Sequence, residues 1–198
     1  MTRGRPPRTR AVHALEACRV DSQSVFALDT SFVVRALHPL EENHDECVEF
    51  LERLTAAEAT VVFNELLYVE LVETAYKLAV MERHGRKAWP AKRGDGRVRR
   101  RATRLATELV DSWREVLSIS SHVEVPLRDV RDRLIPYMSR GLSSYDAAHA
   151  CSCALVGAEM LVTTDRGFSA LSESDLVIAT TVDRVRSYRR NRARRDPH

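Results

Sequence analysis

The sequence has few glycines, few cysteines and no long apolar run, and each shortage excludes a class of protein. Seven glycines in 198 residues leave little material for a glycine-rich loop that cradles phosphates. The four cysteines form no Cys-x-x-Cys pair and no zinc-ligand spacing, so we expect reduced thiols in a cytoplasmic protein. No apolar run approaches the roughly 20 residues of a membrane helix, and none follows the basic residues 1–10 as in a secretory signal.

Charge is distributed unevenly along the chain. The formal net charge is +3, but residues 1–25 carry +3, residues 83–104 carry +9 and residues 184–198 carry +6, which leaves −15 on the remainder. An acidic body with basic segments is typical of a protein that binds a cation in the body and phosphates on the segments. The alternative is that the basic segments are only solvated.

Short apolar segments alternate with helical patterns along most of the chain. Helices are expected at about 29–37, 42–54, 64–84, 102–116, 127–138 and 144–156, and strands at 25–28, 60–63, 122–125, 160–163 and 176–179. This alternation predicts an α/β fold in which helices cover both faces of a parallel twisted sheet of about four to five strands.

The same patterns predict how the chain is divided. We expect one domain over residues 25–183, preceded by a flexible basic N-terminal arm over 1–24 and followed by an Arg-rich C-terminal tail over 184–198. A basic insert at about 86–101 has the composition of a loop, with glycine and proline among arginines. A loop of this length is usually functional or disordered.

Four acidic residues are the strongest candidates for a site. Asp29 and Asp165 end short apolar strands, whereas Glu70 and Asp146 lie inside helical patterns. Ligands of an open α/β sheet bind beyond the carboxyl ends of the strands, and unpaired buried charge is too costly to occur without a partner. Hard carboxylate oxygens suit Mg²⁺ or Mn²⁺, and such an ion activates water and neutralises charge on a phosphodiester.

Each acid also has a structural interpretation. Asp29 is suited to cap a helix, Glu70 to be one more exposed helical acid, and Asp146 to stabilise the first turn of its helix through the dipole. Asp165 is suited to a turn. Glu65 is a competing candidate that we rank below Glu70.

Several other side chains are candidates for supporting roles. Thr30 and Thr163 could orient a carboxylate or hold a metal-bound water, and His149 follows Asp146 by one helical turn, although a structural role would also explain it. Tyr145 and Phe168 flank two of the acids and could stack on bases, with core packing as the alternative for Phe168. In the insert, basic residues surround Trp89 and are expected to bind RNA: Arg86, Lys87, Lys92, Arg93, Arg97, Arg99, Arg100 and Arg101.

Four segments carry these acids in order along the chain. They are residues 28–34 (LDTSFVV), 64–71 (NELLYVEL), 142–150 (LSSYDAAHA) and 161–168 (LVTTDRGF). Together they resemble the PIN-domain ribonucleases, most closely the VapC-type toxins of toxin–antitoxin pairs, over about residues 26–183. VapC-type toxins are usually shorter, so the N-terminal arm, the insert and the C-terminal tail depart from the pattern.

The resemblance implies a fold, an activity and partners. Asp29, Glu70, Asp146 and Asp165 would form the catalytic acidic cluster, hold Mg²⁺ or Mn²⁺, and hydrolyse RNA by metal-activated water. A cognate antitoxin protein and a homodimer are expected on the same ground. Two alternatives stay open, namely a PIN-like RNA-binding module without catalysis and a PIN nuclease of RNA maturation or decay.

Overall fold

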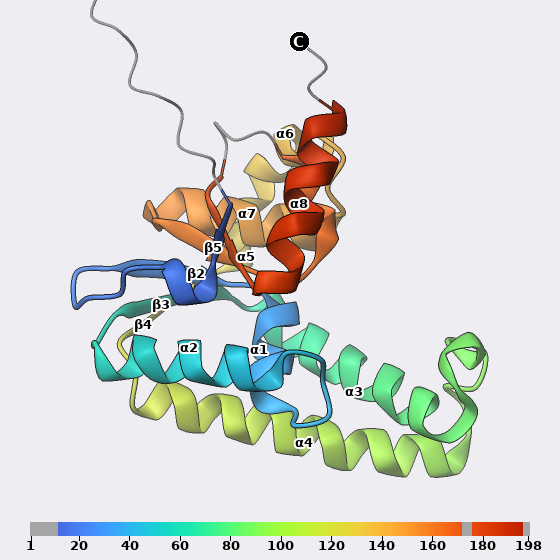
Figure 1. Ribbon diagram of the computed structural model, residues 1–198. Coiled ribbons are helices and arrows are strands. Elements are labelled where there is room, and N and C mark those ends of the chain that lie inside the picture. The colour runs from blue at the N-terminus through green and yellow to red at the C-terminus, as the bar shows by residue number, and fades with distance from the viewer. Residues whose placement is uncertain (1–11, 172–175, 196–198) are drawn as a thin grey trace, which may run out of the picture.

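The computed structural model describes residues 12–171 and 176–195, with side chains described as far as residue 188 (Figure 1). Its described strands form one six-stranded sheet in the order β1-β6-β5-β2-β3-β4, in which every pairing is parallel. The strands are β1 (Val12–Ala14), β2 (Val25–Leu28), β3 (Thr60–Asn64), β4 (His122–Val125), β5 (Met160–Val162) and β6 (Ile178–Thr180). The predicted parallel α/β fold is confirmed, with a sheet slightly larger than expected.

The additional strand comes from the segment that we expected to be a flexible arm. Residues 12–14 form β1 against β6 at the edge of the sheet, and the short helix η1 (Leu15–Ala17) follows. Val12 and Leu15 are only 3% and 1% exposed. The arm prediction therefore differs from the structure over residues 12–24, because a few buried apolar side chains hold this segment on the core. Residues 1–11 lie outside the described residues.

Helices cover both faces of the sheet (Figure 1). Successive side chains of a strand alternate between two cores, one on each face. Phe26 and Leu28 of β2 enter one core, whereas Ala27 enters the other. The first core is covered by α1 (Thr30–Leu37), α2 (His44–Ala56), α3 (Leu66–His84) and α4 (Gly96–Ser118). The second is covered by α5 (Leu127–Val130), α6 (Leu134–Met138), α7 (Ser144–Val156) and α8 (Val182–Arg195). The helix predicted over 127–138 is divided into α5, η3 (Arg131–Arg133) and α6.

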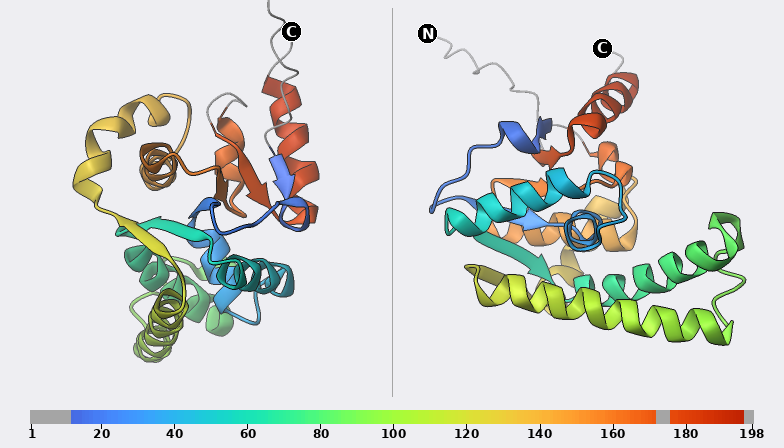
Figure 2. Two further views of the ribbon diagram at one scale, coloured as in Figure 1. Left: turned by 90° about the vertical axis from the view of Figure 1, so that its left-hand side faces the viewer. Right: turned by 60° about the horizontal axis from the view of Figure 1, so that its bottom comes forward.

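Helices α3 and α4 form a long hairpin that extends beyond the rest of the molecule (Figure 2). The expected loop at 86–101 is largely structured, because η2 (Arg86–Ala88) follows α3 and α4 begins at Gly96. Asp95 caps α4 by accepting hydrogen bonds from the amides of Arg97 and Val98. Buried Val98 packs with other apolar residues between the two helices, so the helix starts earlier than its basic composition suggests.

The topology places a switch point beside β2. From β2 the chain runs outward through β3 and β4, and then crosses to β5 on the other side of β2. Ligand sites of open α/β sheets lie at the carboxyl ends of the strands at such a point. In the described part of the chain, no helix is both long enough and apolar enough to cross a membrane. The predicted C-terminal tail begins within α8, whose backbone is helical to Arg195.

Candidate functional site

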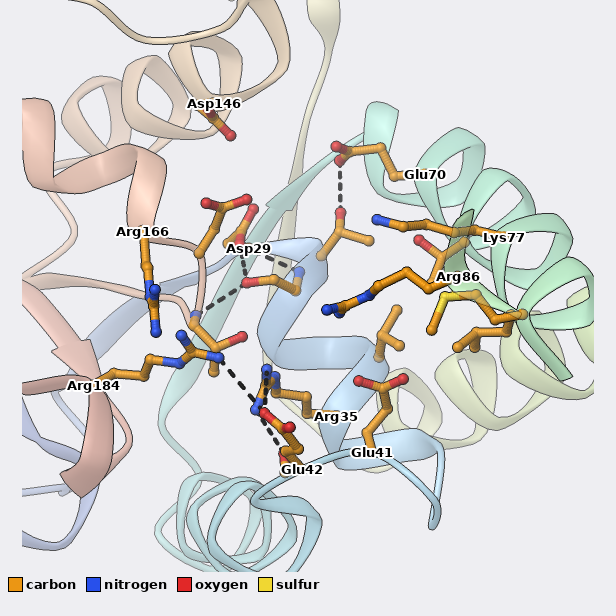
Figure 3. A pocket seen from close by; sticks show the side chains of 18 residues that line it. Asp29, Arg35, Glu41, Glu42, Glu70, Lys77, Arg86, Asp146, Arg166 and Arg184 are labelled. Atoms are coloured by element: carbon orange, nitrogen blue, oxygen red, sulfur yellow. Dashed lines mark hydrogen bonds and ion pairs between the residues drawn. The ribbon is translucent and has the colours of Figure 1, made fainter. Parts of the chain in front are cut away.

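A cavity of about 740 Å³ lies at the carboxyl ends of β2 and β5 (Figure 3). All four predicted acids line it, together with Thr30 and Thr164. The acids come from four places in the fold: Asp29 follows β2, Glu70 is in α3, Asp146 is in the first turn of α7 and Asp165 follows β5. The fold thus brings together side chains that are far apart in the sequence.

Asp29 is both a helix cap and a member of the cavity. Its side-chain oxygen Oδ2 accepts hydrogen bonds from the Ser31 amide at 3.2 Å, the Ser31 hydroxyl at 2.5 Å and the Thr163 hydroxyl at 2.8 Å. Burial raises the pKa of Asp29, and the hydrogen bonds from Ser31 and Thr163 only partly oppose this shift. These donors hold Oδ2 at the start of α1 while Asp29 also lines the cavity. The capping role and a site role are therefore compatible for this residue.

Glu70 is held by a chain of polar side chains. Asn64 Oδ1 accepts from the Leu66 amide at 3.0 Å, so the Asn64 side-chain nitrogen donates to His149 Nδ1 at 3.2 Å. His149 Nδ1 is therefore an acceptor, and the ring hydrogen lies on Nε2, which donates to Glu70 Oε2 at 2.7 Å. Thr30 donates to the same oxygen at 2.6 Å. Glu70 is thus fixed in place, unlike an ordinary surface acid on a helix.

Asp146 and Asp165 converge above Gly167. A Cβ atom at Gly167 would lie 2.9 Å from Asp146 Oδ2 and 3.3 Å from Asp165 Oδ1. The Asp165 carboxylate accepts from the Gly167 amide at 2.7 Å and so caps η4 (Arg166–Ala170). Burial and the charges of Asp165 and Asp29 raise the pKa of Asp146 to about 6, despite its hydrogen bonding with Ser143. The absence of a side chain at 167 is what allows this close approach.

Cationic side chains reach the cavity from two sides. Lys77 of α3 and Arg86 of η2 approach from one wall, whereas Arg166 of η4 and Arg184 of α8 approach from the other (Figure 3). Arg184 lies 3.7 Å from Glu42, and its Nε is buried without a hydrogen-bond partner among the described residues. The acidic centre is therefore flanked by groups that suit phosphate oxygens.

The carboxylate oxygens that line the cavity are of the chemical type that binds a hard divalent cation. Side-chain oxygens of Asp146 and Asp165 lie within 3.3 Å of a common point above Gly167, and Asp29 adds a buried carboxylate to the same cavity. Mg²⁺ and Mn²⁺ prefer such oxygen ligands. As the side chains stand, no three His, Cys, Asp or Glu residues of the described chain are grouped closely enough to hold a metal ion. Holding one would require these carboxylates to move closer together.

The eight basic residues that we predicted to bind RNA do not form one surface. Arg86 lines the acidic cavity. A separate hollow of about 610 Å³ between α3 and α4 is lined by Arg97, Arg100 and Arg101. The remaining exposed members of the set are Lys87, Lys92, Arg93 and Arg99.

Two of these arginines are engaged within the hairpin. Arg93 makes two contacts with the Glu73 carboxylate, at 2.8 and 3.0 Å. Arg101 likewise makes two contacts with Glu82, at 2.9 and 3.0 Å. Both pairs tie the segment after α3 back onto α3, so these two side chains have a structural role that the sequence did not indicate.

Other candidates lie away from the cavity. The exposed Glu65 accepts a hydrogen bond from the Leu127 amide at 3.0 Å and does not line the cavity. Phe168 is fully buried in the second core, as the packing alternative predicts. Tyr145 is 47% exposed.

Sequence reasoning missed several members of the site. Ser31 donates to Asp29 and accepts from the Thr164 amide at 3.0 Å, so it joins the loops after β2 and β5. Its place in the Asp29-Thr30-Ser31 motif was an available signal. Lys77 follows Glu70 by two helical turns and thus shares its face of α3. Arg184 had no local signal, because only the tertiary fold brings α8 to the cavity.

Comparison with known proteins gives a family and a related structure. A family model described as PIN domain matches residues 26–174. Among solved structures, the crystal structure of PAE2754 from Pyrobaculum aerophilum is similar, with 21% sequence identity, 87% of this chain and 91% of that chain covered, and a TM-score of 0.46. No curated protein matches this chain. The predicted resemblance to PIN domains is confirmed, and a VapC-type assignment stays a prediction.

Proposed function

This chain belongs to the PIN-domain family, and from that premise we propose that it is a Mg²⁺- or Mn²⁺-dependent endoribonuclease. The PIN domain is generally a nuclease fold, which supports hydrolysis of phosphodiester bonds. The observation that carries the proposal is the single cavity lined by Asp29, Glu70, Asp146 and Asp165 at the switch point of the sheet. Clustered carboxylates without a cation would repel both one another and a nucleic acid.

The proposed roles follow from the contacts of each side chain. Asp29, Asp146 and Asp165 would hold the ion, and Ser31 and Thr163 orient Asp29 by donating hydrogen bonds to its Oδ2. Thr30 and His149 fix Glu70 at the edge of the same cavity. When bound, a divalent ion would supply an activated water and neutralise charge on the phosphodiester. Lys77 and Arg86 would bind the flanking phosphates of the RNA.

The proposal extends to the biological setting. We propose that the protein is the toxin of a type II toxin–antitoxin pair, that it acts in the cytoplasm as a homodimer, and that an antitoxin protein blocks the site. An acidic cavity is suited to receive a basic side chain of such an inhibitor. This part rests on the resemblance of the four motif segments to VapC-type toxins.

A cleavage assay tests the activity. A mixed RNA pool would be incubated with the wild-type protein in Mg²⁺, Mn²⁺ or EDTA, and with Asp146→Asn under the same conditions. Cleavage should require the metal and should fall to the EDTA level in Asp146→Asn. Asp132→Asn is the matched control, because Asp132 is an exposed acid on η3 whose side chain is 87% exposed. Cleavage by Asp146→Asn at the wild-type rate would refute the assignment.

Two further results would change the proposed function. Salt-sensitive RNA binding without cleavage, in protein free of any co-purified inhibitor, would indicate the RNA-binding module. Cleavage that no protein encoded beside this gene inhibits would indicate a nuclease of RNA maturation or decay. The second test is co-expression with the neighbouring small open reading frames, followed by co-purification and the same cleavage assay.

A further inference from the structure

A second cavity adjoins the acidic one and is lined by two aromatic rings. Its volume is about 480 Å³, which is within the roughly 300–1,000 Å³ of typical ligand sites. Glu70, Thr74 and Lys77 line both cavities, so the two lie side by side along α3. Trp89 and Tyr145 complete the lining of the second one with Val69 and Glu73. We refer to it as the Trp89–Tyr145 cavity.

The two rings come from different parts of the fold and are differently supported. Trp89 directly follows η2 and packs against the small apolar cluster between α3 and α4. The Arg93 guanidinium lies 5.7 Å from the Trp89 ring centre and 4.8 Å from that of Tyr76, while it is paired with Glu73. Trp89 is therefore held in position before any ligand binds, which limits the entropy lost on binding.

Tyr145 connects this cavity to the acidic centre. It precedes Asp146 in the first turn of α7 and is 47% exposed. Tyr145 lines the second cavity and Asp146 lines the acidic one, so the first turn of α7 contributes to both. Lys77, in the wall between the two cavities, is placed to contact a phosphate that joins a group in one cavity to a group in the other.

We propose that the Trp89–Tyr145 cavity binds one unstacked nucleobase of the RNA strand whose phosphodiester lies in the acidic cavity. The inference rests on the proposed function for its choice of RNA. Aromatic rings offer stacking surfaces to bases of any sequence, and RNA-binding proteins commonly hold splayed-out bases in this way. Thr74 adds a hydroxyl in the same lining that can hydrogen-bond a base edge. Because bases inside a duplex are already stacked, this subsite would select single-stranded or looped RNA.

Tryptophan fluorescence gives a direct measurement. The chain has two tryptophans, and Trp113 is fully buried in the first core, so ligand-induced changes in emission report on Trp89. The full-length wild-type protein in EDTA would be titrated with a short single-stranded RNA, with the same strand carrying abasic sites, and with duplex RNA. Overall binding would be followed in parallel by the anisotropy of a labelled RNA. We expect quenching of the Trp89 emission with the intact single strand, and no quenching with the abasic strand or the duplex.

Substitutions separate stacking from charge. Trp89→Leu and Tyr145→Leu should each weaken single-strand binding by about 5- to 150-fold, the effect of losing one base–aromatic contact. The slope of binding against salt should stay unchanged, because no phosphate contact is removed. Trp89→Phe retains a ring and should restore most of the affinity, which a general loss of folding would not allow.

The outcomes distinguish this inference from the proposed function. RNA binding with unchanged Trp89 emission and with full affinity in Trp89→Leu would overturn the base subsite, even if the protein cleaves RNA. Quenching by the single strand in a protein that never cleaves RNA would uphold the subsite and reject the nuclease. A protein that binds no RNA, either in EDTA or in Mg²⁺, would overturn both.

Discussion

Gly167 leaves room for the carboxylates of Asp146 and Asp165, and any side chain at position 167 would occupy part of that space. A methyl group at 167 would come within 2.9 Å of Asp146 Oδ2, which is closer than a carbon and an oxygen can approach without movement. We therefore expect Gly167→Ala to displace the Asp146 carboxylate and to lower the rate of RNA cleavage by about a hundredfold, a loss that a misplacement of about 1 Å can cause. The measurement is kcat/KM on one RNA substrate.

The matched control for this substitution is Gly94→Ala. No heavy atom lies within 4 Å of a Cβ at Gly94, and the residue is exposed in the segment before α4. Gly94→Ala should leave cleavage unchanged. Equal activity of both variants would show that the position of Asp146 above Gly167 does not matter for catalysis.

At the scale of elements, β1 and η1 are part of the folded domain and not an appendage. Leu15 is 1% exposed and belongs to the first core. We expect Leu15→Ala to lower the free energy of unfolding by about 2–5 kcal/mol, as for other buried leucines. Urea denaturation measures this change, with Leu40→Ala as the control because Leu40 is 83% exposed. Equal stability of the two variants would support the flexible arm that the basic composition suggested.

The hairpin of α3 and α4 offers a comparison between two adjacent arginines. Arg100 is exposed beside the hollow between these helices, whereas Arg101 is bound to Glu82 through two contacts. Arg100→Gln should reduce the slope of log K against log salt by about 0.7, the value for one contact with a phosphate of single-stranded RNA.

Arg101→Gln should instead leave that slope unchanged and lower stability by no more than about 1 kcal/mol, because both side chains of the pair with Glu82 are partly exposed to solvent. Salt titration of RNA binding and thermal unfolding of both variants provide the data. Identical salt slopes for wild type and both variants would exclude Arg100 and Arg101 from the RNA interface.

At the scale of the whole molecule, the sequence predicted the features that depend on local residue patterns, such as the ends of strands. Asp29 and Asp165 were predicted at strand ends because short apolar runs stop there, and the structure places both beside the switch point. β1 was missed because three residues of strand in a basic segment give almost no periodic signal. The early start of α4 was missed because its first turn is basic, although Asp95 provides a cap.

The remaining features depend on contacts between distant segments. Arg184 reaches the acidic cavity only because α8 packs beside the sheet, and no spacing in the sequence relates it to Asp29. The same is true of Trp89 and Tyr145, which come from opposite sides of α4 in the sequence yet line one cavity. The sequence therefore predicted that the four acids would meet, but it did not indicate which other side chains would line the two cavities.

The four acids of the cavity come from four segments, and their charges repel one another when no metal is bound. This repulsion predicts that wild type and Asp146→Asn exchange their order of stability when a metal is added. A carboxyl group whose pKa is raised is less favourable in its charged form in the folded state than in the unfolded chain. At neutral pH the charge of Asp146, whose pKa is about 6, therefore destabilises the metal-free fold. Asp146→Asn in EDTA should be more stable than wild type by about 1–2 kcal/mol, which is less than the full shift implies because the side chain is partly exposed.

Metal should reverse this order. An ion present at a hundred times its dissociation constant stabilises the folded state by about 2.7 kcal/mol, and only wild type retains all the carboxylates that would hold it. In Mg²⁺ or Mn²⁺, wild type should therefore become the more stable protein, as thermal unfolding of both variants with and without metal would show. If wild type gained no stability from metal while Asp146→Asn remained above it, the four acids would be a source of strain in the fold without being a cation site.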